Sequence, residues 1–334
     1  MHVNFIFFYF LFSTILLFAC KKFNILLDKK SEHHKKFTSS KKSHLIGGIF
    51  FVIFLNYYYL SVEKNMVLCL FYNFIFLLGL LSDLKKFNSV SLRFFIQLVV
   101  IVYFVNYLNF EITSTKVALF DELLKNSLVN IFFVTFCLLV LINGSNFIDG
   151  INCNTTGYFL IVLLVLFFKF DDFNLNNEIL LNLVIILSTI LLLNVFGIIY
   201  LGDSGSYSLS LFFGIFLINF SEANNAISPY FIILLLWYPC FELLFSMIRR
   251  SFKFIKTYEP DTYHLHHLIY RKFKINSDIK NNLILHLLTS STINLYNCIC
   301  FFISVKYIYN SEILILIFII NITLYVALYY FLKK

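Results

Sequence analysis

Charged residues are scarce in this chain of 334 residues: Asp, Glu, Lys and Arg make up 13%, whereas hydrophobic residues make up 60%. A soluble domain has roughly a quarter charged and about half apolar residues. A soluble chain this apolar would expose large adhesive patches. The shortage of charge therefore excludes a soluble enzyme, a disordered tail and a compact basic nucleic-acid-binding domain, and it indicates an integral membrane protein.

Proline and glycine are also few, with 3 and 10 residues, so long apolar runs continue without a break. Such runs cannot be loops, because lipid offers backbone groups no hydrogen bonds. A membrane β-barrel would alternate apolar and polar residues, and the run from Ile179 to Tyr200 does not. We therefore expect an all-α, polytopic membrane protein with a single domain over residues 1–334.

The seven cysteines lack a CxxC pair, the nearest spacing being Cys298-Ile-Cys300. This favours buried thiols and excludes a disulfide framework or a metal knuckle. No Lys or Arg precedes Cys20, whereas Lys21 and Lys22 follow it. A signal peptide begins with basic residues, so the order favours an uncleaved first helix with its N-terminus outside over a lipoprotein signal.

A helix needs about 17–25 apolar residues to cross a bilayer, and the sequence offers eleven candidate spans. They cover approximately 3–20, 45–61, 66–82, 92–108, 128–143, 156–170, 179–200, 206–220, 228–248, 283–305 and 310–332. An odd number of spans places the two chain ends on opposite sides of the membrane.

Basic residues divide unequally between the two sets of loops that eleven spans define. Of the 26 Lys and Arg residues, 21 fall on one side and 5 on the other. Loops rich in Lys and Arg remain in the cytoplasm. The bias therefore predicts a cytoplasmic C-terminus, and it explains the net charge of +8 without a nucleic-acid partner.

Four polar clusters lie at helix ends on this cytoplasmic side: Asp83, residues 143–154, residues 202–206 and residues 263–267. The outer loops carry acidic residues but no Gly-Asp turn and no group of histidines. The clusters therefore predict a functional site at the cytoplasmic face.

Two of the clusters contain candidate metal or nucleotide ligands. Asp203 lies in a Gly-Asp-Ser-Gly-Ser segment, which suits either an ordinary turn or a metal carboxylate beside a phosphate-binding helix start. Asn146, Asp149 and Asn152 are spaced by three, so on a helix they would share a face. They could grip a nucleotide or a metal, or merely cap a helix.

The remaining candidates are a histidine group and an acid within a span. His264, His266 and His267 lie close to Arg271, which favours an anionic ligand over zinc or an ordinary surface group. Glu242 lies inside the ninth span, and an intramembrane carboxylate is costly. It suits either a site role or an ion pair with Arg249 or Arg250.

In these motifs the chain resembles the polyprenyl-phosphate N-acetylhexosamine-1-phosphate transferases of bacterial membranes, glycosyltransferase family 4, which include the translocase that makes lipid I. The resemblance covers most of the chain, and four motifs occur in the family's order. The four motifs are LLGLLSDLKKFNSVSLRFFIQ (77–97), NGSNFIDGIN (143–152), LGDSGS (201–206) and EPDTYHLHHLIYRKF (259–273), and Ile46-Gly47-Gly48 resembles the family's Gly-Gly pair after the first cytoplasmic loop. The HxHH form resembles the branch that initiates O-antigen and teichoic-acid synthesis, which also has eleven spans.

The resemblance implies transfer of a sugar 1-phosphate from a UDP-N-acetylhexosamine to undecaprenyl phosphate, with release of UMP, at the cytoplasmic face of the bacterial inner membrane. It implies Mg²⁺ or Mn²⁺ as cofactor and leaves a homodimer open. The implied catalytic residues are Asp83, Asp149 and Asp203, with Asp203 and Asp149 also holding the metal. The implied substrate-binding residues are Asn146, Asn152, Asn194, His264, His266, His267 and Arg271.

The chain departs from the family pattern at several of these positions. Ser82 replaces the first acid of an aspartate pair, and Asn152 replaces the second acid of a DGxDG core. Glu242 stands where Asp is more common, and Asn194 lies about one residue out of register. Two alternatives to an enzyme therefore stay open: a scaffold that only binds polyprenyl phosphate, and a transporter of polyprenyl lipids.

Overall fold

The computed structural model describes residues 2–28, 43–87, 89–169, 177–252 and 262–333, which form thirteen α-helices, one π-helical turn and a short pair of strands. The first helices are α1 (His2–Phe23), α2 (Gly47–Tyr57) with the π-helical turn η2 (Tyr58–Val62), α3 (Met66–Asp83), α4 (Val90–Leu108), α5 (Ala118–Leu124) and α6 (Ser127–Ile148). The later ones are α7 (Asn154–Lys169), α8 (Asn177–Val195), α9 (Gly202–Ala223), α10 (Pro229–Ser251), α11 (Leu265–Asn276), α12 (Asn282–Val305) and α13 (Ser311–Lys333).

Eight of these helices are long and apolar enough to cross a membrane: α1, α3, α4, α6, α9, α10, α12 and α13. Three shorter apolar helices, at 47–62, 154–169 and 179–195, coincide with the other three expected spans. The structure thus supports an all-α polytopic membrane protein, while the number of crossings and their orientation stay predictions. Several basic residues behind the orientation, including Lys35, Lys36, Lys41 and Lys42, lie outside the described residues.

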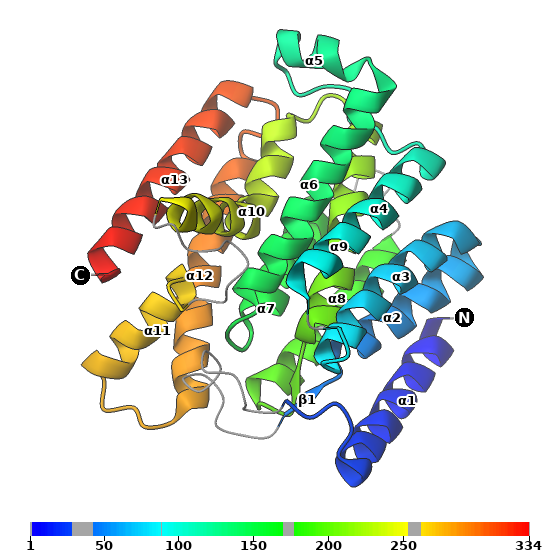
Figure 1. The fold of residues 1–334 in the computed structure, drawn as a ribbon, viewed down its shortest axis with the longest axis vertical. Coiled ribbons are helices and arrows are strands. Elements are labelled where there is room, and N and C mark those ends of the chain that lie inside the picture. Colours follow the sequence, from blue (N-terminus) through cyan, green and yellow to red (C-terminus); the bar gives the residue numbers. More distant parts are fainter. Residues whose placement is uncertain (1, 29–42, 88, 170–176, 253–261, 334) are drawn as a thin grey trace.

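Helix α9 forms the centre of the bundle and packs against α2, α3 and α6 (Figure 1). Most of its side chains are buried, and three of its serine hydroxyls bond to carbonyls of the same helix, as Ser208 does to Ser204 at 2.7 Å. Helices α5 and α11, which the sequence analysis did not anticipate, lie at opposite ends of the bundle (Figure 1). This placement agrees with the prediction that their loops face opposite sides of the membrane.

A short pair of parallel strands, β1 (His44–Leu45) and β2 (Ile199–Tyr200), corrects the expected span at 179–200. Helix α8 ends at Val195, and Gly197 then adopts a positive φ of 63°. The pairing brings Gly48 against the start of α9, where an added Cβ would lie 2.4 Å from the backbone nitrogen of Gly205. The Gly47-Gly48 pair is therefore a point of close backbone contact between α2 and α9.

Pro239 lies inside α10 and has no N–H to donate to the carbonyl of Leu235, four residues earlier. The hydroxyl of Tyr158, on α7, donates to that carbonyl at 2.8 Å. Both tyrosine and carbonyl are in the buried core, where an unpaired acceptor is costly. Tyr158 thus supplies the hydrogen bond that the proline removes.

We expect Tyr158→Phe to lower the free energy of unfolding by about 1–2 kcal/mol, because the carbonyl of Leu235 would lose its donor. Unfolding in mixed detergent micelles measures this loss. Tyr103→Phe is the matched control, since Tyr103 is 60% exposed on the outer face of α4. Equal stability of the two variants would contradict the assigned role of Tyr158.

Candidate active site

Asp83, the last residue of α3, caps the N-terminus of α9. Its Oδ1 accepts a hydrogen bond from the backbone N–H of Asp203 at 2.9 Å. Its Oδ2 accepts from the N–H and the hydroxyl of Ser204, at 3.0 and 2.7 Å. The first N–H groups of a helix have no partner within it, and Leu201, at the N-cap position of α9, gives no side-chain cap. A carboxylate also interacts favourably with the positive end of the helix dipole.

Two glycines make room for this cap. Gly202 has a positive φ of 75°, and a Cβ there would lie 2.7 Å from Oδ2 of Asp83. A Cβ on Gly79, one turn before Asp83, would lie 2.4 Å from Cα of Ser204. The glycine of the Gly-Asp segment therefore serves both the backbone turn and the approach of the carboxylate.

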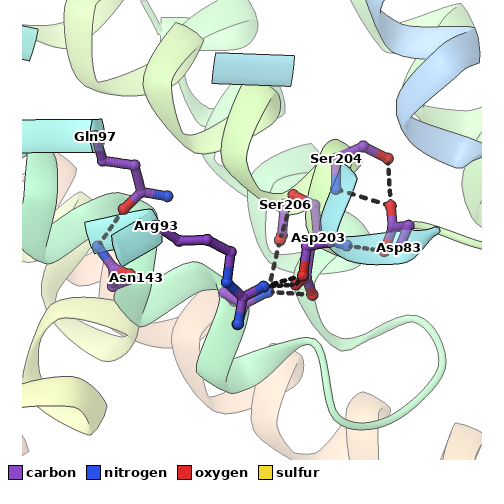
Figure 2. A network of polar contacts seen from close by, with 9 residues as sticks. Asp83, Arg93, Gln97, Asn143, Asp203, Ser204 and Ser206 are labelled. Carbon is purple, nitrogen blue, oxygen red and sulfur yellow. Dashed lines mark hydrogen bonds and ion pairs between the residues drawn. The ribbon is translucent and has the colours of Figure 1, made fainter. Parts of the chain in front are cut away.

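The side chain of Asp203, in the first turn of α9, contacts side chains from three other helices (Figure 2). Arg93 of α4 forms an ion pair with its Oδ2 at 2.8 Å, and Ser82 of α3 donates to the same oxygen at 2.5 Å. Asn146 of α6 donates to Oδ1 at 2.8 Å. Arg93 also donates to Ser82. The side chain of Asp203 keeps an exposed fraction of 31%, so a ligand can reach this carboxylate.

Buried polar side chains pack against Arg93 and hold its position. The hydroxyl of Tyr207, also on α9, contacts both Arg93 and Gln97. Gln97 is 1% exposed and accepts a hydrogen bond from Asn143 at 3.1 Å (Figure 2). The guanidinium of Arg93 is therefore held toward Asp203 by residues of α4, α6 and α9.

The end of α6 connects this carboxylate centre with the histidines. The helix ends at Ile148, so the expected row of Asn146, Asp149 and Asn152 stops at Asp149, which is the C-cap. Asp149 is partly exposed. The next residue, Gly150, lies directly against the histidines, because a Cβ there would be 2.4 Å from Nε2 of His266.

Asn152 and Asn194 are structural in their contacts and are not brought to Asp203. Asn152 donates to the carbonyl of Asn194 at 3.0 Å, and its Oδ1 lies 3.0 Å from Nδ1 of His286 on α12. Asn194 accepts from the N–H of Cys153 at 2.5 Å and donates to the carbonyl of Ile199 at 2.8 Å. Both asparagines are almost fully buried, and they fix the turn that presents Asp149 and Gly150.

The three histidines form a compact group at the start of α11. The ring of His266 lies 5.6 Å from that of His264 and 4.2 Å from that of His267. His266 is fully buried, and among the described residues neither ring nitrogen has a hydrogen-bond partner. Burial, with further contributions from His267, His264 and His286, lowers the pKa of His266 well below its ordinary value. His266 is therefore a neutral imidazole with one donor and one acceptor.

Arg271 lies one turn further along α11 than the histidines. Its guanidinium donates to the carbonyl of Thr262 at 2.8 Å and lies 5.5 Å from the ring of Tyr263. These contacts hold the segment that leads into the histidine group. Glu259 to Asp261, the first residues of the similar segment, lie outside the described residues.

A magnesium ion suits the oxygen donors of this site. Among the residues that the structure describes, no three His, Cys, Asp or Glu side chains are arranged to hold a metal by themselves. Mg²⁺, however, usually binds one or two carboxylates together with substrate phosphates. Asp203 can serve as such a carboxylate, because its side chain is partly exposed. Among the described residues, its Oδ1 accepts one hydrogen bond, from Asn146. Asp149, the C-cap of α6, lies one helical turn beyond Asn146 in the sequence.

Sequence reasoning missed three contributors to the site: Arg93, Tyr207 and His286. Arg93 belongs to the similar segment 77–97 and to the positive charges that set the topology, but the sequence prediction gave it no role in the site. Tyr207 follows the Gly-Asp segment directly. His286 stands in an apolar span with no motif around it, so only its place within a membrane helix could have marked it.

The fold and the site define a polytopic membrane protein with carboxylates, an arginine and histidines at one end of its helical bundle. Residues 65–221, just under half of the chain, match glycosyl transferase family 4. This segment runs from α3 to α9 and contains Asp83, Asp149 and Asp203. The match supports a polyprenyl-phosphate sugar-1-phosphate transferase in general. The search of curated proteins finds no match to the chain.

Proposed function

We propose that the protein transfers an N-acetylhexosamine 1-phosphate from a UDP-sugar to undecaprenyl phosphate and releases UMP. The product would be a polyprenyl diphospho-sugar that initiates a cell-surface polysaccharide of the O-antigen, capsule or teichoic-acid type. The positive-inside bias favours the cytoplasmic face of a bacterial inner membrane as the place of reaction.

The observation that carries this proposal is the carboxylate centre at the N-terminus of α9. A part-exposed acid, an arginine and a helix start meet there, at 2.8 Å between Arg93 and Asp203. The arginine supplies the positive charge that attracts phosphate groups, because Asp83 already accepts hydrogen bonds from the N–H groups of Asp203 and Ser204 at the start of α9. The reaction joins two anions, so a site that combines positive charge with a carboxylate for a divalent cation fits its main requirement.

In the proposed reaction, an oxygen of the lipid phosphate attacks the β-phosphorus of the UDP-sugar. The bond between that phosphorus and the bridging oxygen breaks, and UMP leaves with the electron pair. A phosphate monoester has its second pKa near 6, so the attacking oxygen carries charge at neutral pH without a strong base. Asp83 would then act mainly by holding the start of α9, and Arg93 by orienting the diphosphate.

Asp203 and Asp149 would hold Mg²⁺ or Mn²⁺, which supplies charge neutralisation for the diphosphate when bound. Asn146 would orient Asp203 and contact the nucleotide. His264, His266 and His267 would contact the sugar or the diphosphate, because the neutral ring of His266 can both donate and accept. Asn152, Asn194 and Arg271, expected at first to bind substrate, would support the surrounding turns.

The test is release of UMP by membranes that contain the protein, supplied with undecaprenyl phosphate, Mg²⁺ and a panel of UDP-N-acetylhexosamines. We expect release with at least one donor, and reversal by excess UMP. Absence of release with every donor, from protein shown to be inserted, would contradict the proposal. Polyprenyl-phosphate binding without release would favour the scaffold, and movement of the lipid across vesicles would favour the transporter.

A further inference from the structure

Glu242, deep in α10, links three helices of the C-terminal third of the chain. Its side chain is 1% exposed. Its Oε1 lies 3.0 Å from Nδ1 of His264 and 3.4 Å from the backbone N–H of Leu265, the first residue of α11. Its Oε2 accepts from the hydroxyl of Tyr325, on α13, at 2.6 Å. All these residues lie outside the segment that matches the family.

The arrangement stabilises a buried carboxylate. An isolated charge in this position would be strongly unfavourable, and three donors from two other helices converge on it. Arg249 and Arg250, about two helical turns after Glu242 on α10, are the partners that the sequence predicts for an ion pair. Arg249 donates to Ser246 at 3.1 Å, and Arg250 lies 5.4 Å from the ring of Phe147.

The contact with His264 sets both a helix start and a ring position. His264 is the N-cap of α11 and makes no side-chain cap of its own. A carboxylate that accepts from Nδ1 selects the tautomer with hydrogen on that nitrogen, so that Nε2 becomes the acceptor. The ring of His264 also lies parallel to that of His266 and 5.1 Å from the ring of Phe147. Fixing His264 therefore fixes the whole group against Gly150.

We propose that Glu242 is a positioning residue of the histidine group: it sets the tautomer of His264 and docks the start of α11, while Tyr325 secures the carboxylate from α13. The proposal rests on the proposed function for its effect on turnover. It assigns the C-terminal helices α10, α11 and α13 to the assembly of the same site that α3, α4, α6 and α9 build from the other side.

A double-mutant cycle tests whether Glu242 acts through His264. We expect Glu242→Gln to lower kcat/KM for UMP release by about 10- to 100-fold, mostly in kcat, as loss of an orienting partner does at comparable sites. In a His264→Ala background the same change should alter kcat/KM by less than about 2-fold. An equal loss in both backgrounds would overturn the proposal.

Hydrogen exchange of the inserted protein gives a second readout that needs no turnover. In Glu242→Gln, exchange should accelerate in residues 262–276 and stay unchanged in α3, α6 and α9. Unchanged exchange in residues 262–276 would overturn the proposal even if the protein were inactive toward every donor. The proposed function, by contrast, fails only if the unmodified protein releases no UMP.

Two variants complete the design. Glu222→Gln is the matched control, because Glu222 bonds to Thr113 at the opposite end of the bundle, at 3.0 and 2.7 Å. We expect it to leave both readouts unchanged. If Glu242→Gln fails to insert, Tyr325→Phe replaces it, since it removes one donor and keeps the contact with His264. It should lower kcat/KM by about 3- to 10-fold, again only when His264 is present, and an equal loss without His264 would overturn the proposal.

Discussion

Asp203→Asn is expected to lower the rate of UMP release by about 1,000-fold or more, in a protein that still inserts into the membrane. The amide removes the negative charge that faces Arg93 at 2.8 Å. It also places an NH₂ group toward either Arg93 and Ser82 or Asn146, all of which are donors to Asp203. The variant thus loses both the proposed metal ligand and the ion pair that orients Arg93.

The measurement is kcat for UMP release at saturating donor and Mg²⁺, normalised to inserted protein. Asp278→Asn is the matched control, because Asp278 follows α11 and is exposed. Thermal unfolding of both variants separates loss of chemistry from loss of fold. Near-normal turnover in Asp203→Asn would contradict the assignment of Asp203 as the metal carboxylate.

The helices themselves follow from the apolar runs, because a lipid environment leaves the backbone few alternatives to a helix. The eleven expected ranges therefore coincide with helices. The apolar runs do not predict where each helix ends. Residues 196–200 are as apolar as the helix before them, yet Gly197 and the pairing of Ile199 with His44 end α8 early. A pairing between residues so far apart in the sequence cannot be predicted from local hydropathy.

Topology alone predicts which polar residues share one membrane face, and the structure brings Asp83 and Asn146 into contact with Asp203. Placing Asp83, Asn146, Asp149 and Asp203 at one membrane face follows from counting spans and charges. The partners within that face do not follow, because each depends on a contact between distant parts of the chain. Glu242 illustrates this: helical spacing suggests a basic residue further along α10, whereas α11 starts beside it and supplies His264.

Asp83→Asn is expected to lower kcat for UMP release by about 100-fold and the free energy of unfolding by about 1–3 kcal/mol. An asparagine has only one acceptor oxygen. Its NH₂ group would face at least one of the N–H donors, of Asp203 or Ser204, from which Asp83 now accepts hydrogen bonds. The start of α9, and Asp203 with it, would lose its cap. Asp121→Asn is the matched control, since Asp121 also accepts a backbone hydrogen bond, from Thr115 at 2.6 Å, but at α5.

The pH dependence of the residual activity distinguishes a cap from a base. If Asp83 removed a proton from the acceptor phosphate, the acidic limb of the pH–rate profile would disappear in Asp83→Asn. Three donors already bind its two oxygens, so we expect no proton transfer to Asp83 during turnover and a scaled-down profile of unchanged shape. Loss of the acidic limb, together with a normal unfolding free energy, would contradict the cap and assign the base to Asp83. A pH–rate profile of unchanged shape, together with reduced stability, would mean that Asp83 acts by capping α9, the helix that carries Asp203.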